Sequence, residues 1–455
     1  MRENRIYYHG VPPSSGFGSF EQAMHADGPV IWTLSEPYGA RDWWPCKQVL
    51  EDKIDSVDII VTTLSDYQVA ANGVLVDVQE LDRIKKYHWK HRYPITTYLI
   101  AIAVTNYQIQ ESKIILSGDT LPFVNYLFPK DFAFKVDRLR RTEQLMALFD
   151  STLGDYPFME EQYGHAEFEW PGGMEHQTMS FIGFFDQGLI AHELAHQWFG
   201  NQVTCGSWQD IWLNEGFATY MTGLAYLYIS PPEAWNFWIR RTQLDATSQP
   251  DGSVYVDDTT SLSRIFNGNL TYQKGAMVLH MLRWELGHER FFEGVRNYLS
   301  DPDLRFGYAR TPDLQFHLEQ VSGRNLDEFF ADWIYGQGYP SYDLNWQRRS
   351  DTLFITLHQT QSHVSVDFFE MDIPLQIVGW GGEEQMVRVT HTQSGQVFAV
   401  PVDFAVQEVV FDPERWILSR DNVVTSLDQS LSTLDFKFEA DTHRWRASWD
   451  KRRSL

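Results

Sequence analysis

The 455-residue chain has little of what characterises small secreted domains or membrane proteins. Its two cysteines, Cys46 and Cys205, are too few for a disulfide framework and are not spaced as a metal knuckle. No run approaches the ~18 consecutive apolar residues that a membrane-spanning helix needs, and the opening residues lack an apolar stretch of signal-peptide length. We therefore expect a soluble chain, cytoplasmic if it is complete and exported or periplasmic if an upstream signal has been lost.

Basic residues are also scarce. The chain has 37 Lys and Arg against 61 Asp and Glu, a net charge of -24. Nucleic acids and anionic membranes bind basic surfaces, so we expect neither as a partner. The 43% of hydrophobic residues suffices for extensive burial, and the length favours two to four domains.

Hydrophobic patterns divide the chain into strand-rich and helical regions. Residues 59–64 and 97–105 have the composition of β-strands. Residues 135–154 have the apolar spacing of an amphipathic helix that ends near Gly154. Helical patterns then continue until alternating apolar residues and paired turns, from about residue 341, indicate a β-sandwich. For the C-terminal tail, residues 422–455, a terminal helix is the favoured interpretation.

The densest cluster of chemically distinctive residues lies between Ala191 and Tyr220. It contains HExxH, with His192 and His196 one turn apart on the same face of a predicted helix, so both imidazoles can reach one metal ion. Glu193 lies beside them. HExxH by itself also occurs by chance on ordinary exposed helices.

A second glutamate strengthens the metal interpretation. Glu215 follows His196 after 18 intervening residues, early in a second predicted helix. Two histidines and a glutamate form a known ligand set for catalytic zinc, which keeps its fourth position for water. We therefore predict one Zn²⁺ per chain, held by His192, His196 and Glu215. Zinc lowers the pKa of that water, and Glu193 is the candidate base that takes its proton.

The segments around these residues, WFGNQVT and WLNEGFA, resemble the aminopeptidase N family of gluzincin zinc metallopeptidases. The resemblance covers about residues 30–420. It implies a multidomain α+β protein with a partial, saddle-shaped N-terminal β domain that is truncated or unusually short, then a thermolysin-like mixed α/β catalytic domain, a C-terminal β-sandwich and a tail. The expected bounds are 1–121, 122–340, 341–421 and 422–455.

The sequence Gly172-Gly173-Met174-Glu175-His176 matches the GxMEN signature of this family except at its last position. The resemblance implies that the first four residues bind substrate. An exopeptidase must reject internal peptide segments, and a fixed carboxylate that pairs with an ammonium group does this. Glu175 is the candidate for that role. His176 stands where the family usually has asparagine.

Two further residues take roles from the resemblance. Glu36, five positions before Arg41, matches a family position that helps to bind the free α-amine of the substrate. Tyr272 matches the tyrosine of the YxKGA motif, which stabilises the transition state in the family. A tyrosine hydroxyl can donate a hydrogen bond to a developing oxyanion.

These residues together predict a zinc aminopeptidase that acts on peptides with a free N-terminus. One alternative is another hydrolase on the same scaffold, such as an epoxide hydrolase. A second, less favoured alternative is a non-catalytic binding protein derived from a peptidase. No motif marks the preferred N-terminal residue or the oligomeric state.

Overall fold

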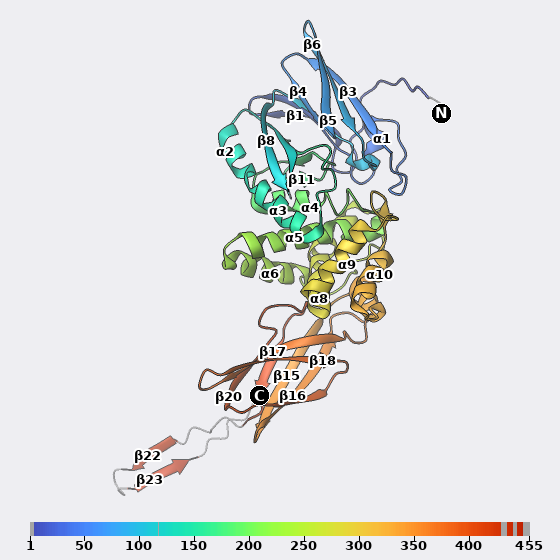
Figure 1. The fold of residues 1–455 in the computed structure, drawn as a ribbon. Helices are drawn as coiled ribbons and strands as arrows, with labels where there is room; N and C mark the ends of the chain where they lie inside the picture. The colour runs from blue at the N-terminus through green and yellow to red at the C-terminus, as the bar shows by residue number, and fades with distance from the viewer. Residues whose placement is uncertain (1–3, 117, 429–434, 440–443, 449–455) are drawn as a thin grey trace. The chain divides into compact units, whose positions relative to one another are not determined.

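The structure is a computed structural model that describes residues 4–116, 118–428, 435–439 and 444–448 (Figure 1). The chain forms two compact units, Met1–Gly338 and Tyr339–Leu455. Helices occur together with several β-sheets, which confirms the multidomain α+β class. Within the described ranges, no helix is both long and apolar enough to cross a bilayer. The finer domain bounds stay predictions.

The N-terminal region contains two antiparallel sheets. One has the strand order β1 (Ser19–His25), β2 (Gly28–Leu34), β7 (Ile102–Thr105) and β4 (Gln68–Ala71). The other has the order β3 (Val57–Leu64), β6 (Ile84–His91) and β5 (Val74–Leu81), and β3 contains the strand predicted over 59–64. The short helix α1 (Ala40–Trp43) follows β2.

The strand predicted over 97–105 is wrong in its first half. A short 3₁₀ helix, η1 (Thr97–Leu99), precedes β7. Asn72 explains the difference, because its Nδ2 donates to the Leu99 carbonyl at 2.9 Å and its Oδ1 accepts from the Ala101 N–H at 2.7 Å. These bonds satisfy backbone groups that would otherwise pair with a neighbouring strand.

A mixed five-stranded sheet follows in the same unit. Its strand order is β11 (Gly173–Met174), β12 (Ser180–Ile182), β10 (Tyr163–Glu167), β9 (Asp119–Leu127) and β8 (Gln108–Leu116). β10 pairs in parallel with β9 and β12, whereas β11 pairs antiparallel with β12 at the edge. The residues of the GGMEH sequence thus begin at an edge strand.

The helical part is organised around α5 (Trp212–Ile229), which packs against five other helical segments. Every residue of α5 from Trp212 to Ala225 is buried, as expected for a helix that is apolar on all sides. The helix predicted over 135–154 is two helices, and the second ends at Leu153, directly before Gly154. The helical segments of this part are α2 (Phe132–Leu139), α3 (Arg141–Leu153), α4 (Gln187–Ala195), η2 (Trp208–Asp210), α6 (Pro232–Ala246), α7 (Leu262–Ile265), η3 (Gly268–Lys274), α8 (Gly275–Leu286), α9 (His288–Ser300), α10 (Thr311–Ser322), α11 (Asp327–Phe330) and η4 (Ala331–Tyr335), and a two-stranded sheet joins β13 (Thr204–Cys205) to β14 (Tyr308–Ala309).

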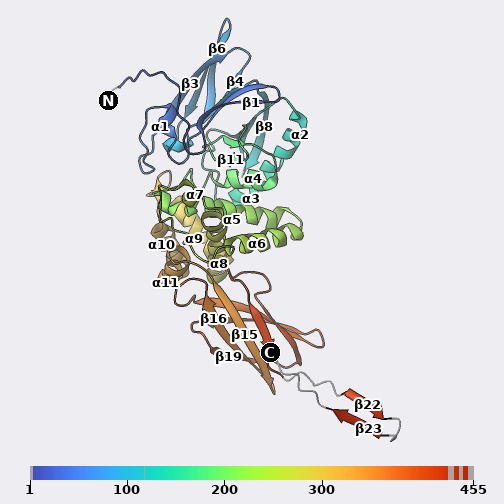
Figure 2. The same cartoon turned by 180° about the vertical axis from the view of Figure 1, so that it is seen from behind.

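The second unit contains two facing sheets, seen from behind in Figure 2. Along β15 (Pro340–Arg349) and β16 (Thr352–Gln361) buried residues alternate with more exposed ones, as predicted for a sandwich. In the tail, β22 (Asp435–Glu439) pairs with β23 (Arg444–Ser448), so the terminal helix expected there is wrong in these segments. One sheet has the strand order β19 (Gln396–Pro401), β16 (Thr352–Gln361), β15 (Pro340–Arg349) and β21 (Val423–Ser426). The other has the order β18 (Glu384–His391), β17 (Met371–Gly379) and β20 (Val406–Phe411).

An aromatic core joins the N-terminal strands to the helical part of the first unit. Trp32 of β2 meets Phe168 edge-on, with ring centroids 5.3 Å apart. Tyr98 of η1 meets Trp208 of η2 at 5.4 Å. All four rings are buried in one hydrophobic cluster. This packing fixes the end of β2, and the residues that follow it, beside the helical part that carries the predicted metal ligands.

Candidate active site

Two helices carry the predicted metal ligands. α4 begins after Asp186, whose Oδ1 accepts a hydrogen bond from the Leu189 N–H at 3.0 Å and so caps the helix. His192 lies in the last turn of α4, and His196 caps its C-terminal end. Glu215 lies in the first turn of α5, which packs against α4. The three side chains therefore project into one space.

Their ligand atoms are within a few ångströms of each other. Nε2 of His192 lies 3.1 Å from Oε2 of Glu215 and 3.1 Å from Nε2 of His196. Nε2 of His196 lies 3.3 Å from the same carboxylate oxygen. Nδ1 of His196 donates to the Phe199 carbonyl at 2.9 Å, which turns the Nε2 lone pair toward the cluster. This is the donor set and the compactness that a tetrahedral metal ion needs.

Carboxylates surround this cluster on its other sides. Glu36, Glu175 and Glu215 offer oxygen atoms within 4.8 Å of one another. Oxygen atoms of Glu175 and Glu193 and a ring nitrogen of His196 lie within the same distance of each other. These glutamates are only 3% to 4% exposed. Within the described ranges, Oε1 of Glu36 and Oε2 of Glu193 are buried without a hydrogen-bond partner, and no lysine or arginine pairs with any of these carboxylates. Buried carboxylates need cations, so the site is built to receive positive charge.

The excess of negative charge shifts the pKa values of the glutamates and histidines in the site. Burial, reinforced by the neighbouring carboxylates, raises the pKa of Glu36 and of Glu193 well above the ordinary range. Burial alone would lower the pKa of His196, but the charges of Glu175 and Glu215 outweigh it and raise this pKa to about 10. Burial alone would raise the pKa of Glu215, yet the two histidines lower it to about 2.

A cavity of about 240 Å³ connects these groups. The ring of Tyr272 borders it and lies nearly parallel to the His192 ring, with centroids 6.0 Å apart. A Cβ added to Gly173 would overlap the Glu193 carboxylate, so glycine leaves room for that side chain. The lining residues are Phe17, Leu34, Glu36, Trp170, Gly173, Met174, Glu175, Leu189, His192, Glu193, His196, Glu215 and Tyr272.

Residues 186–333, which include both ligand helices and Tyr272, match the peptidase family M1 domain. This segment is a domain of peptidase family M1. This is the aminopeptidase N family of gluzincin metallopeptidases to which the motifs point. The match excludes the segments that carry Glu36 and Glu175.

Relatives extend this similarity over most of the chain. It is 29% identical over 342 residues to a leucyl aminopeptidase of Saccharolobus solfataricus, covering 70% of this chain and 42% of the relative. It is 30% identical over 463 residues to probable aminopeptidase 1 of Sulfurisphaera tokodaii, covering 95% and 54%. The tricorn protease-interacting factor F2 of Thermoplasma volcanium is 26% identical over 440 residues, covering 90% and 53%. The chain thus spans about half the length of these curated relatives.

Residues outside the predicted site hold Glu175 in place. Asn201 Nδ2 donates to the Glu175 carbonyl at 2.8 Å. The Tyr98 hydroxyl donates to Oε1 of Glu175 at 3.4 Å, and Asn214 Nδ2 in turn donates to this hydroxyl at 3.4 Å. Asn201 and Asn214 lie within the segments WFGNQVT and WLNEGFA, which signalled the family, whereas nothing in the sequence marks Tyr98.

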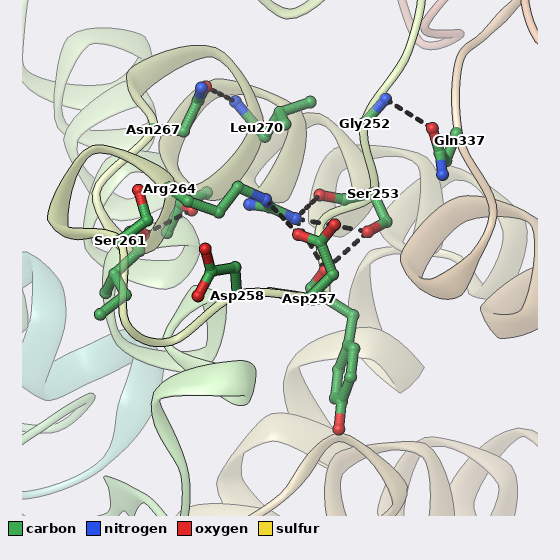
Figure 3. Close-up of polar contacts among 12 residues, drawn as sticks. Gly252, Ser253, Asp257, Asp258, Ser261, Arg264, Asn267, Leu270 and Gln337 are labelled. Carbon is green, nitrogen blue, oxygen red and sulfur yellow. Dashed lines mark hydrogen bonds and ion pairs between the residues drawn. The ribbon is translucent and has the colours of Figure 1, made fainter.

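The segment before Tyr272 is anchored by polar contacts (Figure 3). Oδ1 of Asn267 accepts from the Leu270 N–H at 3.0 Å and so caps η3, the π-helical segment that carries Tyr272. Arg264 Nε donates to Oδ1 of Asp257 at 2.6 Å, and Nη2 donates to the Ser253 carbonyl at 2.9 Å. The two bonds of Arg264 join α7, which precedes η3, to the loop before it.

Two residues of the GGMEH sequence lie outside the cavity lining. The Gly172 carbonyl accepts a hydrogen bond from the Gly183 N–H at 2.8 Å, so its role in this structure is to hold the edge of the sheet. His176 is fully buried against Phe181, with ring centroids 4.3 Å apart. Burial lowers the pKa of His176 to about 3, so the ring is neutral near pH 7. Neither ring nitrogen has a hydrogen-bond partner among the described residues.

Proposed function

We propose that this chain is a zinc-dependent aminopeptidase that removes N-terminal residues from peptides. The observation that carries the proposal is the pair of buried carboxylates, Glu36 and Glu175, in the same cavity as the cluster of His192, His196 and Glu215. The pair of carboxylates suits an ammonium group, and the cluster of two histidines and a glutamate suits a metal ion. The names of the two archaeal aminopeptidase relatives support the same activity.

Zinc fits the donor set because two imidazoles and one carboxylate match its known catalytic ligands. His192, His196 and Glu215 would hold the ion. When bound, zinc would polarise the scissile carbonyl and lower the pKa of the attacking water. The partnerless Oε2 of Glu193 is consistent with a group that faces reactants.

Glu193 and Tyr272 would carry the proton and the developing charge. The Glu193 carboxylate would take a proton from the attacking water and deliver it to the leaving amine, because it borders the cavity beside the ligands. Burial raises the pKa of Tyr272 well above its ordinary value, so its hydroxyl keeps its proton at neutral pH. It would donate a hydrogen bond to the carbonyl oxygen as that oxygen gains negative charge.

Glu175 and Glu36 would bind the α-ammonium of the substrate. An ammonium in contact with both carboxylates would relieve the repulsion between them, so binding is strongest for a charged, free N-terminus. An acylated N-terminus lacks that charge and would leave both buried carboxylates uncompensated. The pair therefore selects exopeptidase over endopeptidase cleavage.

The test combines metal analysis with a substrate comparison. We expect about one zinc ion per chain and hydrolysis of leucine p-nitroanilide but not of its N-acetyl form or of an epoxide substrate. A chelator should abolish this activity and added zinc should restore it. Glu193→Gln should keep zinc and lose at least about 100-fold in kcat.

Glu289→Gln, which alters an exposed glutamate of α9, is the matched control and should match the unmodified chain in rate. Absence of bound zinc, together with unchanged activity in Glu193→Gln, would overturn the proposal. Turnover of the epoxide alone would identify the other hydrolase on this scaffold.

A further inference from the structure

The cavity has an apolar end as well as a charged one. Phe17, Leu34 and Trp170 line it beside the glutamates. Leu34 is the last residue of β2 and lies two positions before Glu36. The side chain of an N-terminal residue branches from the same carbon as its α-ammonium. A substrate held by Glu36 must therefore place that side chain close to this apolar end.

Phe17 comes from a tight turn of the N-terminal segment. The Gly18 N–H donates to the Ser15 carbonyl at 2.9 Å, and Gly16 and Gly18 have φ values of 55° and 130°, where glycine is favoured. A Cβ added to Gly16 would lie 3.0 Å from the Glu36 carbonyl oxygen. The turn thus packs directly against the backbone of Glu36, which brings Phe17 to the side of the amine-binding carboxylate.

Aromatic packing holds the Phe17 ring in place. Its centroid lies 5.6 Å from that of Trp170 and 5.1 Å from that of Phe266, with interplanar angles of 58° and 62°. Trp170 in turn lies 6.4 Å from Trp32, within the aromatic core described above. These tilted rings form a preorganised apolar wall. All the charged lining residues belong to the amine-binding and metal-binding groups already assigned, except Glu193, the proposed base.

We infer that Phe17, with Trp170 and Leu34, forms the pocket for the N-terminal side chain and selects large apolar residues such as leucine, methionine and phenylalanine. This inference rests on the proposed aminopeptidase function. A leucine side chain buries apolar area against these three residues that alanine lacks. Arginine or glutamate would lose hydration there without gaining a partner of opposite charge.

The test is a profile of kcat/KM over p-nitroanilides of leucine, phenylalanine, alanine, arginine and glutamate, measured on the zinc-loaded full chain. We expect leucine and phenylalanine to exceed alanine, arginine and glutamate by at least about 10-fold. Phe17→Ala should lower kcat/KM for leucine and phenylalanine by about 10-fold and leave alanine within about 2-fold. Phe17→Leu should restore most of the leucine activity.

Phe237→Ala is the matched control, because this phenylalanine is 73% exposed on α6, outside the cavity lining. Its profile should equal that of the unmodified chain, and zinc content and thermal unfolding confirm the folding of each variant. Equal rates for all five substrates, a preference for alanine or a charged residue, or an unchanged profile in Phe17→Ala would overturn the pocket assignment and leave the aminopeptidase function standing. A chain that cleaves none of the five would instead contradict the proposed function.

Discussion

At the scale of single residues, the site depends on groups that fix its carboxylates as well as on the carboxylates themselves. Glu175 accepts one bond from Tyr98 at its side chain and one from Asn201 at its carbonyl. Tyr98 is buried, packs against Trp208 and lies outside the cavity lining. Removing the Tyr98 hydroxyl tests how the Glu175 carboxylate is positioned without removing the charge of that carboxylate.

Tyr98→Phe should raise KM for a free N-terminal substrate by about 5-fold, the equivalent of one hydrogen bond, with bound zinc unchanged. The reason is that the Glu175 carboxylate loses the donor that orients it. Steady-state kinetics on leucine p-nitroanilide give KM and kcat separately. Tyr107→Phe is the control, since the Tyr107 hydroxyl donates to the Glu167 carbonyl at 2.6 Å, outside the cavity lining. A KM that rises equally in both variants would contradict the positioning role.

The buried Lys274 makes the free energy of unfolding depend on pH. It is 1% exposed, and its ammonium donates to the Gly252 carbonyl at 3.3 Å. Burial, with the nearby charge of Arg264, lowers its pKa to about 7, whereas the unfolded value is near ~10.4. Between these values the unfolded chain binds more protons, so Lys274 should contribute about 2 kcal/mol to the rise in the free energy of unfolding from pH 7 to pH 9.

Urea unfolding of the first unit at both pH values measures this rise. In Lys274→Met the contribution should disappear, because methionine carries no titrating group. Lys113→Met, at an exposed position of β8, should retain it. A rise of the same size in Lys274→Met would show that other groups cause it.

At the scale of elements, the close crossing of α5 with the start of α8 brings Glu215 and Tyr272 to one cavity. A Cβ added to Gly275 would lie 3.2 Å from the Gly216 Cα, and one added to Gly216 would lie 3.2 Å from the Gly275 backbone. The two glycines therefore permit backbone contact between segments that carry a predicted ligand and the predicted oxyanion donor.

Gly275→Ala should separate these segments by a few tenths of an ångström and lower kcat by about 3- to 10-fold, because Tyr272 moves away from the reacting carbonyl. Zinc content should not change, since the ligands lie on α4 and α5. The rate of leucine p-nitroanilide hydrolysis provides the measurement. Gly268→Ala is the matched control, because an added Cβ there has no neighbour within 4 Å. Equal losses in both variants would count against the close-approach explanation.

At the scale of the whole molecule, one unit contains the entire candidate site. Its lining residues run from Phe17 to Tyr272, all within Met1–Gly338. The second unit is a β-sandwich with its own core strands. A ligand that binds only the native first unit stabilises that unit by mass action.

Metal removal should therefore act on one unfolding transition. With a chelator, the Tm of the first unit should fall by about 5 to 10 °C, as expected for loss of a ligand present at about 1,000 times its Kd. The Tm of the sandwich should stay unchanged. Differential scanning calorimetry, with and without added zinc, resolves the transitions. A chelator effect confined to the sandwich transition would be incompatible with a metal ion between α4 and α5.

Sequence alone determined the features that depend on local spacing. His192 and His196 share a helix face because they are one turn apart, and the strands of the sandwich follow from alternating apolar residues. Motif resemblance selected Glu36, Glu175 and Tyr272, which the structure brings into one cavity although the motif sequences do not encode their distances.

Tertiary structure alone decided which residues support and complete that cavity. Tyr98 reaches Glu175, Asn72 interrupts a predicted strand, and Phe17 meets Trp170, across separations of 77, 27 and about 150 residues. Such contacts depend on how the N-terminal strands pack against the helices, and hydrophobic periodicity specifies only which face of an element is buried. It does not specify which distant side chain lies opposite, because many partners of similar volume and polarity satisfy the same pattern.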